Sequence, residues 1–271
     1  MLTIAGSDSG GGAGIQADLK AFAARGVHGA SAITAITAQN TLGVTAIHTV
    51  PADVVLAQVR AVASDLGVDA VKIGMLGERE TTLAVAEALA ELPAEVPVVL
   101  DPVMVAESGA RLLASEAQQA LLEQIVPRAD VITPNVPEAR ALLGERPGGD
   151  ADEAEARQLV RRLLALGPGA VVLTGGHSKS GSDLLLESDR EAPLAISGPR
   201  HPDGAAHGSG CTHAAALAAG LALGETLERA ARTARALAGE AVGRGLRELG
   251  AGPGPVDVLG LSSRRRGCAA D

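Results

Sequence analysis

Apolar positions follow two different periods along the chain. Short, nearly continuous apolar runs alternate with longer stretches in which apolar residues recur at helical spacing. The first pattern predicts buried strands and the second predicts amphipathic helices. The predicted strands are Leu2–Ala5, Ala30–Thr37, Ala70–Ile73, Val96–Leu100, Asp130–Ile132 and Ala170–Thr174. The predicted helices are Ala13–Arg25, Ala52–Leu66, Glu78–Leu92, Ser115–Ile125, Glu138–Leu143, Asp152–Leu166, Thr212–Ala222 and Thr226–Leu246.

This order of elements predicts the fold class. Helices that separate hydrophobic strands indicate right-handed crossovers, and therefore an α/β fold with a mostly parallel sheet. Gly181–Ser188 and Ala192–Ser197 have the spacing of a hairpin, which predicts an antiparallel edge. The stretch Glu145–Asp152 is typical of a surface loop, but the alternation continues beyond it. We therefore expect one domain over residues 1–260 and a disordered tail over 261–271.

Polar residues interrupt the pattern after nearly every strand. In an open α/β sheet, ligands bind beyond the carboxyl ends of the strands. The stretches that fall there are Gly6–Gly12, Gln39-Asn40, Gly74-Met75, Asp101, Thr133–Glu138, Gly175-Gly176-His177 and Gly208–Cys211. Because all of them are expected at one rim of the sheet, the sequence predicts a ligand site along that rim.

The stretch Gly208–Cys211, which leads into a helix of small residues, is the strongest candidate for chemistry. Gly208, Ser209 and Gly210 let backbone N–H groups turn toward one point, and the helix adds the positive end of its dipole. We therefore expect a phosphate there. The same field favours the thiolate of Cys211, which makes it a candidate base or nucleophile. The alternative is that these residues only begin a helix.

The glycine loop Gly6–Gly14 has the outline of a dinucleotide-binding fingerprint, because it lies between a predicted strand and a predicted helix. Asp8, however, occupies the turn that a pyrophosphate would have to approach. Gly208–Cys211 also offers a better phosphate site. A nicotinamide or flavin enzyme is therefore disfavoured.

Four side chains could contact a small substrate. Asp18 could accept a hydrogen bond from a substrate hydroxyl, or it could lie on a solvated helical face with Lys20. The amide of Gln39 matches the hydrogen-bonding edge of an aminopyrimidine, although a lone Gln is more often a turn residue. Met75 and Val103 could supply the apolar faces of such a pocket, or they could simply pack in the core.

Asn135 and Glu138 have the spacing of a capping box, in which two side chains close a helix start on each other. The functional interpretation is that Glu138 orients Mg²⁺ or its waters between phosphates, as phosphoryl transfer requires. Asp101 could belong to the same acidic cluster. Asp-Pro after a strand is also an ordinary stop signal.

Composition narrows the possible partners. The 271 residues are enough for one large α/β domain, and the hydrophobic fraction of 46% supports a substantial core. One Phe and no Trp or Tyr leave no aromatic platform for single-stranded nucleic acid. A formal charge of −9 also disfavours nucleic acid and anionic membranes.

The cysteines and the apolar runs indicate a compartment. Cys268 lies in a polar tail, so a structural disulfide with Cys211 is not expected and a reducing compartment fits better. Glycines interrupt the first apolar run at once, and Ala214–Gly224 is too short to span a bilayer. We therefore expect a cytoplasmic protein with no membrane partner.

Taken together, these segments resemble the ribokinase-like superfamily and, within it, the hydroxymethylpyrimidine/phosphomethylpyrimidine kinases of thiamine biosynthesis. The segments that carry the resemblance are Leu2–Asp8, Gly11–Lys20, Ala38–Thr41, Lys72–Leu76, Asp101–Met104, Thr133–Asn135, Gly175–His177 and His207–Thr212. They occur in the family's order from the first strand to Asp257.

The resemblance implies a ribokinase-like three-layer α/β/α sandwich and an ATP-dependent kinase that uses Mg²⁺. It implies phosphorylation of 4-amino-5-hydroxymethyl-2-methylpyrimidine to its monophosphate and then to the diphosphate. Gly208–Cys211 would be the anion hole, with Cys211 in the place that other ribokinase-like kinases give to a catalytic Asp. The resemblance also implies a homodimer.

Further site residues follow from the same resemblance. The pyrimidine-pocket positions are Gly6, Asp18, Gln39, Met75 and Val103, and the ATP- or metal-linked positions are Asp101, Asn135, Glu138 (to the metal through water) and Thr174. Thr174 stands where the family often has Lys, so a cationic phosphate contact is missing or comes from elsewhere, with Lys179 as a nearby candidate. Ser209 replaces the usual Thr, which leaves the backbone donors intact.

Two other functions stay open on the sequence. A pyridoxal or pyridoxine kinase has the same motifs, and Gln39 and Met75 favour the pyrimidine over pyridoxal. A non-catalytic ligand sensor on the same fold is the third possibility. Intact Cys211 and Glu138 argue against a sensor.

Overall fold

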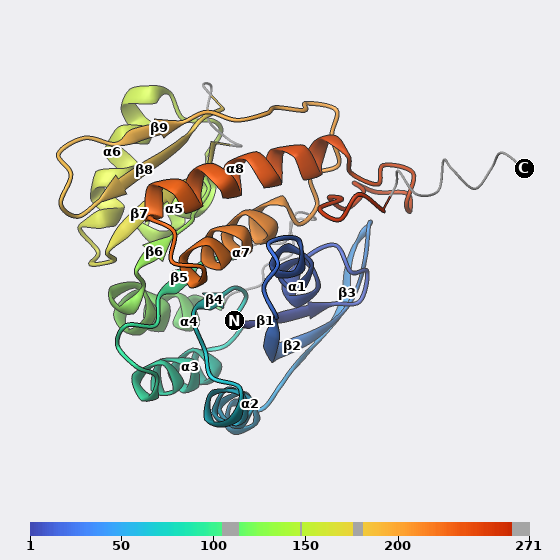
Figure 1. Ribbon diagram of the computed structural model, residues 1–271, viewed down its shortest axis with the longest axis vertical. Helices are drawn as coiled ribbons and strands as arrows, with labels where there is room; N and C mark the ends of the chain where they lie inside the picture. The colour runs from blue at the N-terminus through green and yellow to red at the C-terminus, as the bar shows by residue number, and fades with distance from the viewer. Residues whose placement is uncertain (105–113, 147, 176–180, 262–271) are drawn as a thin grey trace, which may run out of the picture.

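The structure is a computed structural model that describes residues 1–104, 114–146, 148–175 and 181–261. Over these residues the strands form one nine-stranded sheet in the order β3-β2-β1-β4-β5-β6-β7-β8-β9 (Figure 1). The neighbouring strands from β2 across to β7 are parallel, which confirms the predicted sheet type. The strands are β1 Leu2–Asp8, β2 Ala30–Asn40, β3 Gly43–Thr49, β4 Val71–Ile73, β5 Val98–Leu100, β6 Val131–Ile132, β7 Ala170–Leu173, β8 Asp183–Glu187 and β9 Leu194–Ile196.

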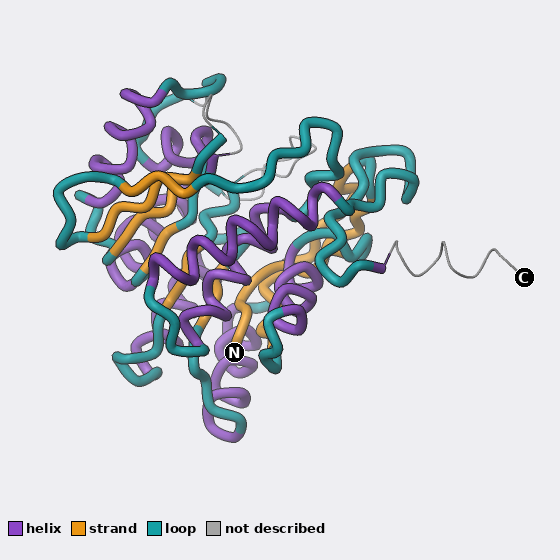
Figure 2. Tube along the Cα trace, turned by 45° about the horizontal axis from the view of Figure 1, so that its top comes forward, coloured by secondary structure: helices purple, strands orange, loops and turns teal. Residues whose placement is uncertain are grey.

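Helices cover both faces of this sheet (Figure 2). The helices are α1 Gly14–Ala24, α2 Ala52–Asp65, α3 Arg79–Glu91, α4 Ser115–Ala120, the π-helical turn η1 Leu121–Ile125, the 3₁₀ turn η2 Val126–Arg128, α5 Val136–Leu142, α6 Glu153–Leu164, α7 Ser209–Ala222 and α8 Leu227–Gly243. Buried residues of α2 to α6 pack on one face, and those of α1, α7 and α8 pack on the other. The predicted three-layer α/β/α arrangement is confirmed.

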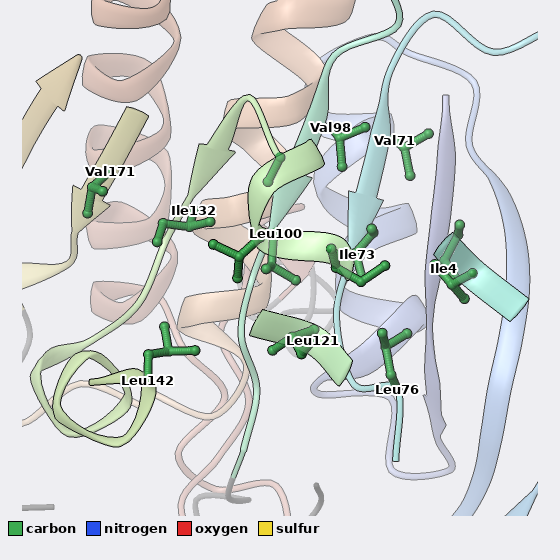
Figure 3. Packing of buried hydrophobic residues seen from close by; sticks show 14 of the residues in the cluster. Ile4, Val71, Ile73, Leu76, Val98, Leu100, Leu121, Ile132, Leu142 and Val171 are labelled. Carbon is green, nitrogen blue, oxygen red and sulfur yellow. The ribbon is translucent and has the colours of Figure 1, made fainter. Parts of the chain in front are cut away.

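Side chains alternate between the two faces of the sheet along the short central strands, so the core consists of two clusters, one on each face. Val71 and Ile73 of β4 point into the larger cluster with Ile4 and Leu100 (Figure 3). Lys72, between them, points to the opposite face because side chains alternate along a strand. A charged residue therefore enters the layer of α1 and α7.

The sheet ends in antiparallel strands at both edges. The hairpin of β8 and β9 is the predicted edge. The antiparallel pairing of β2 with β3 at the other edge is not predicted by the sequence analysis. Asn40 accepts hydrogen bonds from the backbone N–H groups of Leu42 and Gly43, which turns the chain back. Most of β3 is exposed, so it lacks the continuous apolar pattern of a buried strand.

Helix α7 is enclosed by its neighbours. Its residues from 214 to 219 are fully buried, and it packs against both α1 and α8 (Figure 1). Alanine and glycine permit this closeness, since a Cβ added to Gly220 would lie 2.7 Å from the Cβ of Ala230 on α8. The helix begins at Ser209, earlier than the predicted Thr212, because Gly208 forms its N-cap in the left-handed region at φ 81°.

Other boundaries differ for local reasons. The segment predicted as one helix over 115–125 is α4 followed by η1, and α5 begins at Val136 because Asn135 caps it. Among the helices of the described residues, none combines the length and the apolar character needed to cross a membrane. Nearly all of the predicted tail lies outside the described residues.

Candidate active site

The predicted rim exists at the carboxyl ends of the parallel strands. Gly74 follows β4, Asp101 follows β5, Thr133 follows β6 and Thr174 follows β7. Adjacent parallel strands end at the same edge of a sheet, so these residues lie in a row. Helix α7 contacts β4 and β5, which brings its first turn to the middle of this row.

The two glycine-rich stretches meet there. A Cβ added to Gly208 would lie only 1.8 Å from the carbonyl oxygen of Gly12, so the backbones are in direct contact. The backbone N–H of Gly14 is close enough to the sulfur of Cys211 to lower the pKa of its thiol slightly, against the larger effect of burial. The first turn of α7 therefore lies against the loop that follows β1.

Asp8 holds this first loop. Its carboxylate accepts hydrogen bonds from the backbone N–H groups of Gly10, Gly12 and Ala13 at 2.7, 2.9 and 2.8 Å. It also lies 3.2 Å from Nε2 of His207. Although burial opposes the shift, His207 and these amides lower the pKa of Asp8. The loop amides are thus engaged by Asp8, which supports the rejection of a dinucleotide site.

A buried ion-pair cluster lies beneath the middle of the rim, and its central residue was not among the predicted site residues. Lys72 has no exposed surface, and its Nζ lies 3.0 Å from Oδ1 of Asp18 and 3.4 Å from Oδ2 of Asp101. Thr3, the partner of Lys72 on β1, donates a hydrogen bond of 2.6 Å to Asp18. A lysine inside a short apolar strand is the signal that could have identified this cluster.

The structure overturns one of the two interpretations of Asp18. It has no exposed surface, so the solvated-face alternative is wrong. Its Oδ2 accepts hydrogen bonds from Thr3 and Lys72, whereas its Oδ1, in the ion pair with Lys72, is buried without a hydrogen-bond partner among the described residues. Lys20 donates to the carbonyl oxygen of Gly11 instead of sharing a solvated face. A hydrogen bond between Asp18 and a substrate hydroxyl stays a prediction.

Charge balance keeps Lys72 protonated. Burial alone would lower its pKa, but the charges of Asp18 and Asp101 and the hydrogen bond to Asp18 outweigh burial and raise it. One buried ammonium thus faces two buried carboxylates. Their negative charge contributes to the pKa shifts of Cys211 and Glu138.

The pKa of Cys211 is raised, so the thiolate that the sequence analysis expected is not supported. Burial raises the pKa of its thiol to about 12, Lys72 opposes this shift, and Asp101 and Asp18 add to it. The helix terminus was expected to lower the pKa, but desolvation and the two carboxylates prevail. In the protein without substrates the side chain is a thiol.

Asn135 and Glu138 form the capping box that their spacing predicts. Asn135 accepts from the backbone N–H of Glu138, and Glu138 accepts from that of Asn135, both at 2.9 Å. Burial and the charge of Asp101 raise the pKa of Glu138 to about 8. The two carboxyl groups are therefore close enough to interact, as the predicted acidic cluster requires. Thr174 donates its backbone N–H to the carbonyl oxygen of Pro134, beside this box.

Three of the residues predicted for a pyrimidine pocket, Gly6, Gln39 and Met75, occupy the other half of the rim. A Cβ added to Gly6 would lie 2.4 Å from Cε of Met75, so this methionine covers the glycine. Gln39 lies in β2, and its backbone N–H and carbonyl both bond to the hydroxyl of Ser9. The interpretation of Gln39 as a turn residue is therefore wrong. Val103 is half-buried beyond Asp101.

The rim thus has two halves with the first turn of α7 between them. Gly6, Gln39 and Met75 belong to β1, β2 and the end of β4, whereas Glu138 and Thr174 follow β6 and β7. Within the described part of the chain, no group of three or more His, Cys, Asp or Glu side chains is arranged to hold a metal ion. Lys179 and His177 lie outside the described residues.

The sequence profile of the phosphomethylpyrimidine kinase family matches residues 8–257. The chain belongs to this family. The match includes the residues of the rim from Asp8 to Cys211 and begins two residues after Gly6. The chain is 49% identical to the hydroxymethylpyrimidine/phosphomethylpyrimidine kinase of Rhizobium meliloti (strain 1021), over 94% of this chain and 95% of that relative.

Two solved structures show the same architecture. The phosphomethylpyrimidine kinase of Clostridium difficile 630 is 38% identical, with a TM-score of 0.74 over 86% of this chain and 95% of that chain. The pyridoxal kinase of Staphylococcus aureus, in complex with AMP-PCP and pyridoxal, is 32% identical, with a TM-score of 0.80 over 95% of this chain and 92% of that chain. The expected ribokinase-like fold is confirmed.

The contact of Gly208 with Gly12 predicts that alanine destabilises the protein at position 208 but not at position 210. In the variant Gly208→Ala, the left-handed φ and the contact with the Gly12 carbonyl should lower the free energy of unfolding by about 2 kcal/mol or more. Gly210→Ala is the control, because a Cβ there meets no atom within 4 Å. Urea unfolding measures both, and equal stabilities would contradict the described contact.

Glu138 predicts a pH dependence of stability. Its pKa is raised from the ordinary 4.5 to about 8, so the unfolded chain loses this proton at lower pH than the folded protein does. The free energy of unfolding should therefore fall between about pH 4.5 and pH 8 because of this group. In Glu138→Gln that contribution is absent, so the variant should gain stability relative to the wild type as pH rises. A pH-independent difference in urea unfolding would contradict the raised pKa.

Proposed function

We propose that this protein is a hydroxymethylpyrimidine/phosphomethylpyrimidine kinase of thiamine biosynthesis. It transfers the γ-phosphoryl group of ATP to the hydroxymethyl oxygen of 4-amino-5-hydroxymethyl-2-methylpyrimidine, and then phosphorylates the monophosphate. The family match and the 49% identity to the Rhizobium meliloti kinase support this reaction. We also propose that residues 1–260 act as one kinase domain.

The observation that carries the proposal is the contact between the two glycine-rich stretches. It puts the start of α7 next to the half of the rim that holds Gly6, Gln39 and Met75. The first N–H groups of a helix have no partner within the helix and can bind an anion, although that of Ser209 donates to the carbonyl oxygen of Ala206 here. A phosphoryl group at Gly208–Cys211 would then lie beside a ring bound over Met75. Backbone N–H groups that the fold already holds in place can stabilise the negative charge that develops during phosphoryl transfer, because they need not move when the transfer occurs.

We assign the nucleotide to the half of the rim that contains Asp101, Asn135, Glu138 and Thr174. The Staphylococcus aureus pyridoxal kinase, similar over almost the whole chain, is known with AMP-PCP. The two carboxylates fit Mg²⁺, which takes one or two protein carboxylates and completes its shell with water and phosphate oxygens. The charge of Asp101 helps to raise the pKa of Glu138, and a cation at this place would relieve that repulsion. When bound, Mg²⁺ would neutralise phosphate charge.

Cys211 is assigned as the group that takes the hydroxyl proton. Its sulfur lies at the start of α7, and burial raises the pKa of its thiol to about 12, so it must first release its own proton to solvent as the substrates bind and only then, as a thiolate, take the hydroxyl proton. Lys72 is the one group near it in the buried cluster that lowers this pKa, and so supports the thiolate form. In a loose phosphoryl-transfer transition state the hydroxyl proton leaves late, so orientation of the oxygen matters more than early deprotonation.

A pyridoxal kinase is the second candidate, because the solved Staphylococcus aureus pyridoxal kinase is similar in structure. The two substrates share a hydroxymethyl group on a heteroaromatic ring. The identity to the Clostridium difficile phosphomethylpyrimidine kinase, 38%, exceeds the 32% to the pyridoxal kinase. The pyrimidine is therefore the leading substrate.

We further propose a cytoplasmic homodimer. Ile36, Leu42 and Ile47 expose 51, 67 and 47% of their surface on the β2–β3 hairpin, where no described element covers them. An exposed apolar strand pair is typical of an association surface. Analytical ultracentrifugation tests the assembly: twice the chain mass supports it, and a monomer at micromolar concentration contradicts it.

An ATP-consumption assay that offers hydroxymethylpyrimidine, its monophosphate and pyridoxal in parallel tests the function. We expect turnover of both pyrimidines, with kcat/KM for hydroxymethylpyrimidine at least about tenfold above that for pyridoxal. Preference for pyridoxal would establish the second candidate. Binding without any turnover would indicate a ligand sensor.

Removal of the proposed proton acceptor should affect the chemical step. In Cys211→Ala we expect kcat to fall by about 10²-fold or more, while the affinity for AMP-PCP changes by less than about twofold. Cys211→Ser is the matched control for side-chain size, since it keeps a hydroxyl at the same place. Steady-state kinetics and calorimetric titration measure the two effects. Unchanged turnover in Cys211→Ala would remove the proposed role.

A further inference from the structure

A second buried polar cluster lies between β8, α7 and α8, away from Lys72. Asp183, at the start of β8, is 2% exposed. Its Oδ2 lies 2.9 Å from Nε2 of His213 on α7, and its Oδ1 lies 3.5 Å from Nε of Arg235 on α8. None of these three residues has a part in the reaction as described above.

The cluster is tied to the rim by backbone contacts. Oδ1 of Asp183 accepts a buried hydrogen bond of 2.7 Å from the backbone N–H of Gly175, the residue directly after Thr174. Arg235 donates from Nη2 to the carbonyl oxygen of Gly181 at 3.0 Å. Gly175 is closely enclosed, since a Cβ there would lie 2.5 Å from the backbone of Ser182. The end of β7 and the start of β8 are therefore fixed together.

The same carboxylate reaches the first turns of α7. His213 lies four positions after Ser209 and two after Cys211, so it follows the proposed phosphate site by about one helical turn. Asp183 thus joins two parts of the site that are far apart in sequence. One is the backbone at Thr174 and Gly175, and the other is the helix that begins at Gly208–Cys211.

We propose that Asp183, His213 and Arg235 are positioning residues for the nucleotide half of the site. They hold the end of β7 at a fixed distance from the start of α7, so that the nucleotide phosphates can contact both at once. This inference rests on the proposed assignment of ATP to the half of the rim with Thr174. A shift of this backbone would misplace the phosphates while the pocket around Gly6 and Met75 stays intact.

The test compares affinity for AMP-PCP with affinity for hydroxymethylpyrimidine, each by calorimetric titration. Asp183→Asn keeps the shape but loses the charge, and His213→Leu loses the donor to Asp183. We expect both variants to bind AMP-PCP about tenfold more weakly or worse, and to bind the pyrimidine within about twofold of the wild type. His213→Gln keeps a donor near the Nε2 position and should recover most of the AMP-PCP affinity.

Arg232→Met on the same helix is the control. Arg232 is half-exposed and pairs with Glu228 on the surface, so both affinities should stay within about twofold of the wild type. If Asp183→Asn does not fold, as judged by its thermal transition, Arg235→Met replaces it with the same expectation.

Two outcomes would overturn the positioning role. One is an unchanged AMP-PCP affinity in both Asp183→Asn and His213→Leu. The other is an equal loss of both affinities, which would mean a general structural role. Failure of the wild type to phosphorylate any pyrimidine would refute the proposed function instead, and the AMP-PCP titrations would still decide the role of Asp183.

Discussion

The candidate active site of this molecule depends on one buried ammonium group held between two buried carboxylates. Lys72, Asp18 and Asp101 come from β4, α1 and the end of β5, so their ion pairs fix three elements relative to one another. Removing a charge from water costs several kcal/mol, and only a well-aligned ion pair offsets that cost. Loss of one partner from such a buried pair costs about 3–5 kcal/mol. The three side chains therefore tolerate little displacement, and the strand ends that carry them are held in place as well.

Close backbone contacts transmit this rigidity to the proposed phosphate site. Gly208 lies directly against Gly12, and the alanines of α7 let that helix pack between α1 and α8. Burial raises the pKa of Cys211 and that of Glu138, and the negative charge of the cluster adds to both shifts, through Asp101 and Asp18 at Cys211 and through Asp101 at Glu138. A site with an excess of negative charge suits substrates that bring a cation and a phosphate chain together. Burial, more than this excess of charge, keeps the thiol protonated.

Much of the fold could be predicted from the sequence, because its buried strands and helices have clear periods and their ends carry polar residues. The predicted helices and parallel strands correspond to α1 to α8 and to β1, β2 and β4 to β7, with boundaries that differ by a few residues. Strand β3 could not be predicted, since a mostly exposed strand lacks a buried period. The capping box of Asn135 and Glu138 is local and was predictable. The partners of Asp18 were not, because the parallel pairing of β1 and β4 is what brings Thr3 and Lys72 together near it. The pKa of Cys211 was not either, because its rise comes first from burial in the folded protein.

The most direct measurement is a crystal structure of the protein with AMP-PCP, Mg²⁺ and hydroxymethylpyrimidine. The account predicts that the terminal phosphate accepts hydrogen bonds from the backbone N–H groups of Gly208–Cys211. It also predicts that the hydroxymethyl oxygen lies between this phosphate and the sulfur of Cys211, with Lys72 still paired to Asp18. A terminal phosphate bound to another part of the rim, with those N–H groups facing solvent, would contradict it.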